Sequence, residues 1–393
     1  MENSERLDIG IIGCGGITRR HIEGINRLKI SGLDVFRIKA VCDRNRDNAR
    51  ARAMQIENFT NERPQIYGDF RKMISDVSLD AVDICLPHYL HHTVAITCLQ
   101  SGLHVFIEKP LAITMRAAKR IMETRQHCGR VLAVGENYRM TPNMRAVWWI
   151  LHNHMIGSPR LIIWNDISLR MKHSGWRDNK LEAGGSWLFD GGVHLADLDR
   201  YQTGLEPIKV YGITRKGAER REGKPVTVDD LAIATIVFER GVVSQWIWSD
   251  NLPGHNILRR IIYCTEGSIT ASYGAENFFR DRLEKLSSNS SILSQLKRDL
   301  INMMKRNMDQ TSLQRFFPNG VEDSFAIELY DFYLAVRDGR KPEVDDVEAY
   351  NDMAVPLSIY ESSYLGEPVL IEKIKSLKIE NYQREINESL SIT

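Results

Sequence analysis

Short apolar runs alternate with helical patterns through the first third of the chain. Runs typical of buried strands lie at residues 7–12, 36–42, 81–86, 105–107 and 131–134. Helical patterns lie between them, at residues 19–28, 46–56, 93–100 and 114–127. Strands that alternate with helices through short loops are typical of a doubly wound parallel sheet. We therefore predict an α/β fold in which residues 1–134 form one such domain.

The pattern becomes strand-rich from residue 160 onward. Apolar runs with alternating polar positions lie at residues 161–167, 208–214, 231–238, 242–249 and 260–264. Glu239-Arg240-Gly241, between two of these runs, is typical of a hairpin turn. Because short turns join antiparallel neighbours, we predict a second, α+β domain at residues 135–375, with a large, mostly antiparallel, open-faced sheet.

A segment at about 276–319 interrupts this pattern. It contains a polar stretch, 286–291, which is expected to be flexible. A helical pattern follows, with the apolar stripe Leu293, Leu296, Leu300, Met303 and Met304. Basic residues flank the stripe, which fits a helix that packs on its own domain or at a subunit contact, or one that lies on a membrane surface. The tail, 376–393, ends in a dozen polar residues that we expect to be loose.

Composition narrows the class of protein. Of the 393 residues, 43% are hydrophobic and 26% charged, and the formal net charge of +1 gives no reason to expect nucleic acid or an anionic membrane as a partner. Six cysteines without a CxxC pair fit reduced thiols better than disulfides or zinc. The N-terminus has no signal-peptide core, and no apolar run reaches the roughly 20 residues that span a bilayer. A cytoplasmic location is expected.

A glycine-rich turn follows the first strand. Gly13, Gly15, Gly16 and Ile17 lie between this strand and a helix, where backbone N–H groups can bind a pyrophosphate. Thr18 replaces the last glycine of the fingerprint, so the match is imperfect.

An acidic residue follows the second strand. Asp43 is placed to accept the ribose hydroxyls of an adenosine, which favours NAD, whereas the adjacent Arg44 would suit the 2′-phosphate of NADP. The alternative is that Asp43 is a turn residue or a helix N-cap.

Two further strands end in polar residues at the same sheet edge. Leu86 ends one strand and is followed by Pro87, His88 and His91, and Glu108-Lys109-Pro110 follows the next strand. Ligands of open α/β sheets lie at the carboxyl ends of the strands, so we predict that Lys109 stands where a substrate would lie and that Pro87 and His88 line the cofactor. The alternatives are a Lys–Glu pair on a surface turn, and a metal bound by the histidines near residue 90. These histidines have no carboxylate or cysteine at ligand spacing, so we predict no metal.

A second candidate site lies in the strand-rich half. Gly184-Gly185 precedes a helical pattern in which Asp190 and His194 are four residues apart and would share one helix face. A carboxylate beside an imidazole stabilises the imidazolium, as a general acid/base pair requires. The alternative is a solvent-exposed contact between the two side chains.

Several motifs occur together in an order typical of one family. They are Gly-x-Gly-Gly-Ile, Pro-x-x-x-His at 87–91, Gly-Leu-His-Val-Phe-Ile-Glu-Lys-Pro-Leu at 102–111, Asn-Tyr-Arg at 137–139, Trp-Arg at 176–177, and Gly-Gly-x-x-x-x-Asp-x-Gly-x-His at 184–194. The chain resembles the glucose–fructose oxidoreductase/inositol dehydrogenase/rhizopine-catabolism (Gfo/Idh/MocA) family of NAD(P)-dependent oxidoreductases, across residues 7–272 and again at 322–371. The resemblance implies a Rossmann domain, and a final helix at about 345–365 that packs back on it.

The family resemblance also implies site residues. The catalytic set would be Lys109, Asp190 and His194, with His194 favoured as proton acceptor, although it and Lys109 could exchange roles. The cofactor residues would be Gly13, Gly15, Gly16, Ile17, Asp43, Arg44, Leu86, Pro87, His88, His91, Glu108, Lys109 and Asn137. Substrate contacts are predicted at Arg139, Trp176 and Arg177. His88 stands where the family usually has asparagine.

The resemblance implies a dehydrogenase that uses NAD, or NADP, on a secondary hydroxyl or carbonyl of a sugar, inositol or related polyol. The alternatives are a lyase or glycosidase that keeps and recycles its NAD, and a non-catalytic dinucleotide-binding sensor. A homodimer or homotetramer through the C-terminal sheet is expected.

Overall fold

The computed structural model describes residues 6–273, 281–288 and 300–392. The chain divides into two compact units, and each is built from separate stretches of sequence. The first unit comprises Met1–Ala112, Ala117–Met140 and Asp309–Ala349. The second comprises Ile113–Arg116, Thr141–Met308 and Tyr350–Thr393.

The first unit contains the predicted parallel sheet. Its strand order is β3-β2-β1-β4-β5-β6, and every pair is parallel. The strands are β1 (Leu7–Ile12), β2 (Phe36–Cys42), β3 (Gln65–Tyr67), β4 (Ala81–Ile84), β5 (His104–Glu108) and β6 (Leu132–Gly135). The order reverses between β1 and β4, which is the ligand-binding switch point of such sheets. The doubly wound prediction is confirmed.

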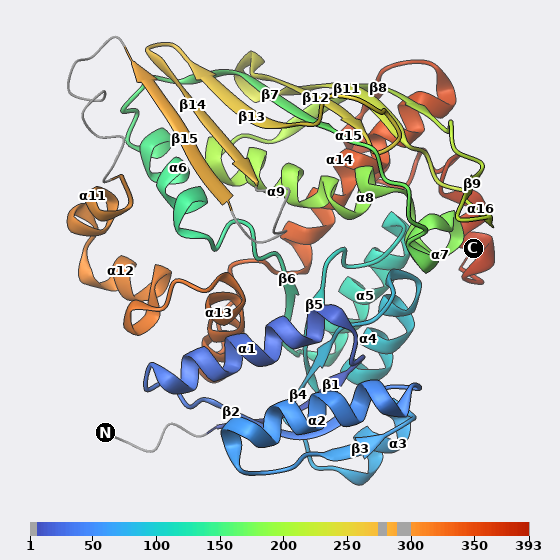
Figure 1. Ribbon diagram of the computed structural model, residues 1–393, viewed down its shortest axis with the longest axis vertical. Coiled ribbons are helices and arrows are strands. Elements are labelled where there is room, and N and C mark those ends of the chain that lie inside the picture. Colours follow the sequence, from blue (N-terminus) through green and yellow to red (C-terminus); the bar gives the residue numbers. More distant parts are fainter. Residues whose placement is uncertain (1–5, 274–280, 289–299, 393) are drawn as a thin grey trace. The chain divides into compact units, whose positions relative to one another are not determined.

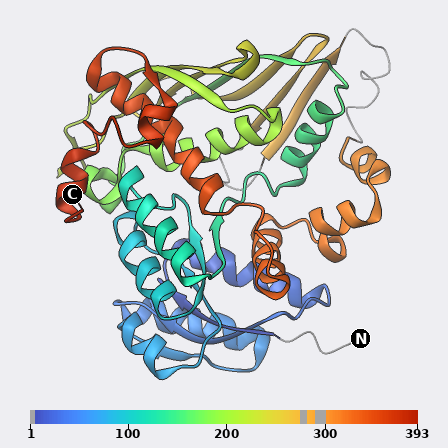
Figure 2. The same ribbon diagram turned by 180° about the vertical axis from the view of Figure 1, so that it is seen from behind.

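Helices cover both faces of this sheet. Figures 1 and 2 show α1 (Gly16–Ile30) and α2 (Arg46–Thr60) on one face, and α4 (His91–Gln100) and α5 (Met115–Cys128) on the other. The strands form the core because they are apolar on both sides, and Ile11, Val82 and Val105 are fully buried. The sequence reading missed β3 and the short α3 (Phe70–Asp76), which are too short to carry a clear period.

A late segment of the chain completes the first unit. Helix α13 (Ser324–Asp338) packs on α1, and the approach is so close that a Cβ on Gly24 would lie 2.9 Å from the Ala326 nitrogen. The helix predicted at about 345–365 is α14 (Asp346–Leu365). Its first turn belongs to the first unit, where Asp346 pairs with Arg125 at 2.9 Å. From Tyr350 onward it belongs to the second unit, where its Ile359 packs on Gly212.

The second unit contains an eight-stranded sheet in the order β15-β14-β13-β7-β12-β11-β8-β16. Only β7 and β12 are parallel neighbours, so the mostly antiparallel prediction is confirmed. The strands are β7 (Pro159–Ile167), β8 (Pro207–Arg215), β11 (Leu231–Phe238), β12 (Val243–Ser249), β13 (Ile257–Cys264), β14 (Gly267–Tyr273), β15 (Asp281–Ser288) and β16 (Val369–Leu370).

One face of this sheet is covered and the other is open. Figures 1 and 2 show α6 (Pro142–His152), α9 (Gly192–Thr203) and α14 on the same face. Along β12, the side chains of Ser244, Trp246 and Trp248 are buried against these helices and alternate with outward-facing positions. In the described chain, no helix lies over the opposite face in either view.

The inserted segment is only partly described. Residues 286–288, predicted to be flexible, belong to β15, which pairs with β14, so that part of the prediction is wrong. Leu293 and Leu296 lie outside the described residues. Helix α11 (Leu300–Asn307) buries Leu300 and Met304 and contacts α6, as expected of a helix that packs on its own domain. No helix in the described ranges is long and apolar enough to cross a membrane.

The C-terminal tail is ordered, so the prediction of a loose end is wrong. Tyr382 stacks on Tyr360 with the ring centroids 4.2 Å apart and the planes nearly parallel. The Gln383 side chain is buried, and its Oε1 accepts a hydrogen bond from the Met115 nitrogen at 2.8 Å. A short helix, α16 (Arg384–Ser389), follows. The polar composition of the tail suggested mobility. It could not reveal the ordering contacts, because these are made with residues far away in the sequence.

Replacing Tyr382 by alanine should therefore destabilise the protein. Loss of the stacked ring is expected to lower the free energy of unfolding by about 2–4 kcal/mol, which urea denaturation followed by fluorescence would measure. Tyr364→Ala is the matched control because Tyr364 lies on α14 with 67% of its surface exposed. Equal stability of the two variants would contradict the ordered tail.

Candidate functional site

The glycine-rich turn leaves room for a ligand at the N-terminus of α1. Gly13 has a φ of +94°, and a Cβ there would lie 2.1 Å from the Cys85 carbonyl oxygen, so the tight turn requires glycine. At Gly15 and Gly16, by contrast, a Cβ would meet nothing within 4 Å. No side chain caps the helix, and its first turn has no acidic residue. These features fit the pyrophosphate of a dinucleotide.

Thr18 has a structural role that explains the departure from the fingerprint. Its side chain is buried, and its hydroxyl donates a hydrogen bond to the Gly13 carbonyl oxygen at 2.8 Å. The threonine therefore closes the turn from inside, away from the open space beside Gly15 and Gly16.

Asp43 lies beside the glycine-rich turn, directly after β2. Its Oδ2 accepts a hydrogen bond from the Cys14 nitrogen at 2.9 Å, and its Oδ1 accepts one from the Asn45 nitrogen at 2.7 Å. Asp43 is therefore a turn residue, but the N-cap of α2 is Asn45. Arg44 is exposed. The structure brings Asp43 to the turn, as a ribose-binding role requires.

Glu108 and Lys109 emerge at the carboxyl end of β5. Glu108 is buried: its Oε1 lies 2.9 Å from His21 Nε2, and its Oε2 accepts a hydrogen bond from the Lys109 nitrogen at 3.1 Å. Lys109 is half-buried, and the Lys109–Pro110 peptide bond is cis. The alternative was a Lys–Glu pair on a surface turn, and the buried position of Glu108 argues against it.

A second carboxyl group lies near Lys109. Glu136 directly follows β6, in which Gly135 pairs with Glu108. Burial raises the pKa of Glu136 to about 8, although the positive charges of Lys109 and Arg139 act in the opposite direction. Near neutral pH, the Glu136 carboxyl group in the surroundings of Lys109 is therefore mostly protonated.

The histidines after β4 point into the protein. His91 is fully buried, and its ring nitrogens lie 2.9 Å from the Leu86 carbonyl oxygen and 2.8 Å from that of Pro110. His88 is also buried and meets His91 edge-on. His91 thus links the loops that follow β4 and β5, while Leu86 and Pro87 remain half-buried at the sheet edge.

Two predicted residues after β6 have partners within the first unit. The Asn137 amide donates a hydrogen bond to the Ser324 hydroxyl at 3.3 Å. The guanidinium of Arg139 is buried and contacts the Glu343 carbonyl oxygen at 3.4 Å and the Glu348 carboxylate at 3.6 Å. These contacts favour a structural role for Arg139 over the predicted role in substrate binding.

In the second unit, Asp190 and His194 lie on two consecutive helices. Asp190 ends α8 (Trp187–Asp190), and His194 lies in the first turn of α9. The single predicted helix is divided at Gly191, where a Cβ would lie 2.3 Å from the Trp187 ring. Both Asp190 and His194 are buried, so the alternative of a solvent-exposed pair is wrong.

The His194 helix is fixed to the sheet by a buried carboxylate. Asp199 on α9 accepts a hydrogen bond from Arg260 on β13 at 2.7 Å and another from the Ser244 hydroxyl on β12 at 2.7 Å. Arg260 is itself buried. Because these charges are paired and hydrogen-bonded, they hold α9 in one position on the sheet.

Trp176 and Arg177 lie together on a short 3-10 helix. The Arg177 guanidinium lies 4.3 Å from the Trp176 ring centroid, and its Nε donates a hydrogen bond to Asp190 Oδ2 at 2.9 Å. The next residue, Asp178, is buried and pairs with Arg221 at 2.9 Å and Arg170 at 2.8 Å. The sequence did not predict the pair with Arg221, because Arg221 is distant from Asp178 in the chain.

His21 is a further residue that the sequence reading missed. It lies on the buried side of α1, and nothing in the local sequence distinguishes it from a residue that only packs in the core. Donor atoms of His21, Asp83 and Cys85 lie within 4.8 Å of one another, the one such group among the described residues. Three donors are one fewer than a structural zinc site requires, and hydrogen bonds account for their spacing.

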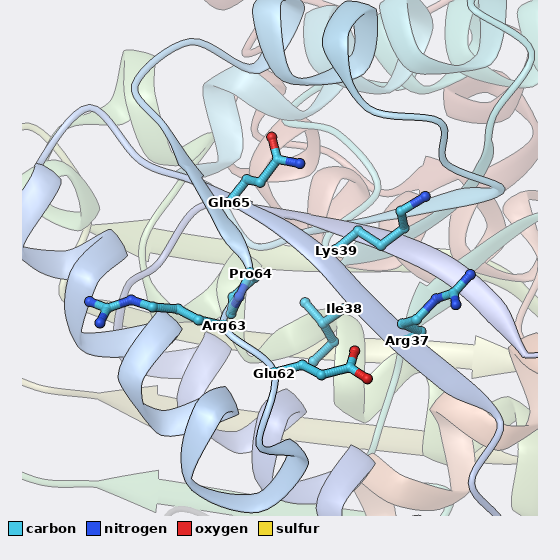
Figure 3. A pocket seen from close by; sticks show the side chains of 7 residues that line it. All are labelled: Arg37, Ile38, Lys39, Glu62, Arg63, Pro64 and Gln65. Carbon is cyan, nitrogen blue, oxygen red and sulfur yellow. The ribbon is translucent and has the colours of Figure 1, made fainter.

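A surface cavity of about 300 Å³ in the first unit is not at the carboxyl edge (Figure 3). It is lined by Arg37, Ile38, Lys39, Glu62, Arg63, Pro64 and Gln65. Arg37 and Lys39 lie near the start of β2, and both pair with Asp8. The cavity therefore lies at the opposite end of β2 from Asp43.

The comparisons with known proteins agree with this geometry. The model of an oxidoreductase family with an NAD-binding Rossmann fold, Gfo/Idh/MocA, matches residues 7–136, and the Gfo/Idh/MocA C-terminal domain matches residues 144–270. A levoglucosan dehydrogenase of Pseudarthrobacter phenanthrenivorans is 28% identical over 299 residues, which cover 68% of this chain and 74% of the relative. A myo-inositol 2-dehydrogenase of Thermotoga maritima is 26% identical over 376 residues, which cover 95% of this chain and 99% of the relative.

The fold is also that of a solved dehydrogenase. The structure of a levoglucosan dehydrogenase in complex with NADH superposes with a TM-score of 0.75 at 22% identity, and the match covers 93% of this chain and 99% of the other.

A buried carboxyl group supports helix α8. Ser186 caps this helix, and its hydroxyl donates a hydrogen bond to Asp229 Oδ2 at 2.9 Å. The Tyr360 hydroxyl donates to Asp229 Oδ1 at 2.8 Å. Burial raises the pKa of Asp229 to about 7, although both hydrogen bonds act in the opposite direction.

Asp229 should therefore make stability depend on pH. Because the folded state holds this proton more tightly, its contribution is fully present below about pH 4 and is lost as the pH rises through about 7. Between about pH 5 and pH 8, the wild type should lose on the order of 2 kcal/mol more unfolding free energy than Asp229→Asn. Denaturant titrations at both pH values measure this difference, and Asp47→Asn, at a residue with 86% of its side chain exposed, is the control. Parallel pH profiles for the wild type and Asp229→Asn would refute it.

Proposed function

Because the chain belongs to the Gfo/Idh/MocA oxidoreductase family, we propose that it is an NAD-dependent dehydrogenase of sugars, inositols or related polyols. The observation that carries the proposal is the placement of Lys109 directly after β5, at the carboxyl edge that also presents the glycine-rich turn and Asp43. The substrate class is supported by the relatives named for levoglucosan and myo-inositol. The reacting group would be a secondary hydroxyl or its carbonyl.

The residues of the first unit fit a dinucleotide. The open space at Gly15 and Gly16 and the uncapped start of α1 suit the pyrophosphate, and Asp43 would accept the ribose hydroxyls. The charge of Asp43 disfavours a 2′-phosphate, which supports NAD. The exposed Arg44 keeps NADP as the second choice. When bound, the nicotinamide would accept or supply the hydride.

The proposal assigns Lys109 of the first unit, and Asp190 and His194 of the second, to one reaction, as the family resemblance implies. His194 would take the hydroxyl proton while Asp190 stabilises the imidazolium. Lys109 would donate a hydrogen bond to the substrate oxygen as negative charge develops on it. Arg177 would orient the Asp190 carboxylate through the ion pair between their side chains. This arrangement favours a positioning role for Arg177, while Trp176 remains a predicted substrate contact.

We further propose that the chain forms a homodimer or homotetramer through the open sheet face. Along β11, Ile233 has 41% of its surface exposed and faces away from the helices, and it pairs with Ile247 of β12. Ile163 and Ile261 are paired neighbours on the same side of β7 and β13. Isoleucines on a sheet face that no described helix covers are typical of a protein interface, and a second copy of the chain would bury them.

A cytoplasmic location is part of the proposal. All six cysteines are free, and four of them, Cys14, Cys42, Cys85 and Cys98, are buried. Free buried thiols are typical of proteins in a reducing compartment.

Replacing Lys109 by alanine should abolish turnover. Assays of nicotinamide reduction with NAD and with NADP, across sugars, sugar acids and polyols, would identify the substrate. Lys109→Ala is expected to lower kcat by roughly 100-fold or more, because a charged group beside the reacting oxygen is lost. Dinucleotide affinity, followed by NADH fluorescence, should stay within about threefold because the glycine-rich turn is unchanged.

Lys119→Ala, at an exposed position of α5, is the control and should behave as the wild type. Full activity of Lys109→Ala would refute the assigned role. No turnover of any compound by the wild type would refute the function. Consumption of substrate without net NADH would instead indicate the recycled-cofactor lyase or glycosidase.

Introducing a charge into the open sheet face should weaken self-association. Ile233→Lys would place an ammonium in an apolar interface and is expected to raise the dissociation constant by roughly tenfold or more. Sedimentation velocity over a concentration series would measure the shift, with Met54→Lys on exposed α2 as the control. A monomeric wild type, or an unchanged Ile233→Lys oligomer, would contradict this interface.

A further inference from the structure

A buried histidine connects the glycine-rich helix to the end of the Lys109 strand. His21 on α1 has no exposed surface. Its Nδ1 lies 2.9 Å from Asp83 Oδ2 on β4, and its Nε2 lies 2.9 Å from Glu108 Oε1 on β5. A carboxylate oxygen can only accept, so both contacts are hydrogen bonds only if the ring carries a proton on each nitrogen. With both carboxyl groups ionised, the geometry therefore calls for an imidazolium.

The charges around the ring agree with this form. Burial alone would lower the pKa of His21, but the charges and hydrogen bonds of Asp83 and Cys85 together raise the pKa well above the ordinary value. Three other titratable groups around this network hold their protons more tightly than usual. Burial raises the pKa of the Cys85 thiol to about 12, and it raises that of Glu328 on α13 well above its usual range. Burial also raises the pKa of Glu136, which acts electrostatically on Glu328, to about 8.

The network continues to the backbone of Lys109. Glu108 holds His21 with one carboxylate oxygen and accepts the Lys109 N–H with the other. The rings of Phe106 and Phe325 lie 5.6 Å from the His21 ring and fill the space beside it. Glu108 therefore has no freedom to rotate without breaking one of its two contacts.

We propose that His21 is a positioning residue for the reaction: as an imidazolium between Asp83 and Glu108, it fixes the backbone of Lys109 relative to the helix whose N-terminus would bind the dinucleotide. This inference rests on the proposed dehydrogenase function. With a neutral residue at position 21, two buried carboxylates would lose their shared counter-charge. One of them would take up a proton, and Glu108 would be free to leave the Lys109 N–H.

The main test compares His21→Gln with His104→Gln. His104 lies at the other end of β5 and accepts a hydrogen bond from the Val131 nitrogen, so it is a histidine of the same strand without a link to Glu108. His21→Gln should lower kcat by roughly tenfold or more and leave the dinucleotide KM within about threefold. The basic limb of its pH–rate profile should move to lower pH, because without the negative charge of the neighbouring carboxylate the charged form of Lys109, which donates to the substrate oxygen, is less favoured. His104→Gln should match the wild type in all three measurements.

A second variant and a spectroscopic measurement guard against misfolding of His21→Gln. Asp83→Asn keeps the ring but removes one charge, and it should give an intermediate loss of kcat. In wild-type protein labelled with ¹⁵N-histidine, the His21 ring should show imidazolium resonances at about pH 7, where an ordinary histidine is mostly neutral. If those resonances disappear in Asp83→Asn or His21→Gln, they can be assigned to the His21 ring.

The outcomes separate the two proposals. If the wild type is active and His21→Gln keeps its kcat and pH profile, or if the His21 ring is neutral, the positioning role is overturned and the dehydrogenase stands. If the wild type turns over no substrate, the proposed function fails and the positioning role fails with it, whatever the NMR shows.

Discussion

All six strands of the first sheet run in the same direction, and this constraint decides where the predicted site residues emerge. The order reverses between β1 and β4, so the loops after these strands diverge and leave space at the carboxyl edge. Gly13 follows β1, Asp43 follows β2 and Lys109 follows β5, so three residues far apart in sequence come to one edge of one sheet. Their arrangement depends on strand order more than on any single contact.

Buried charges hold the functional elements in place in both units. In the first unit, His21 lies between two carboxylates, one of which contacts the Lys109 backbone. In the second, Asp199 ties α9 to the sheet through Arg260, and Asp178 ties the Trp176 segment to two arginines. An ionised group in the interior tolerates few alternative geometries because it loses its partner when it moves. The main effect of these ion pairs is therefore to hold the site residues in a single arrangement, and their contribution to stability is secondary.

Local pattern was sufficient for much of the fold. The bounds predicted for β1, β2 and β11 are those of the structure, because apolar runs with clear ends need no tertiary information. The glycine-rich turn and the Glu-Lys-Pro strand end were recognisable because their chemistry is local. His21, the tail contact of Tyr382 and the packing of α13 were not predictable, since their partners lie far away in the sequence. Arg139 was assigned to substrate by its motif, but burial and its ion pair decide its contacts.

The late segment that completes the first unit also orders events during synthesis. Helix α1 is made early, but the surface around Gly24 that receives α13 stays uncovered until residues 324–338 have left the ribosome. The nucleotide-binding unit therefore starts folding first and finishes after most of the second unit has been made. A nascent chain stalled before α13 would expose the apolar surface of α1 that this helix covers, and exposed apolar surface of this kind is prone to aggregation. A fragment cut after the sixth strand would share the same defect.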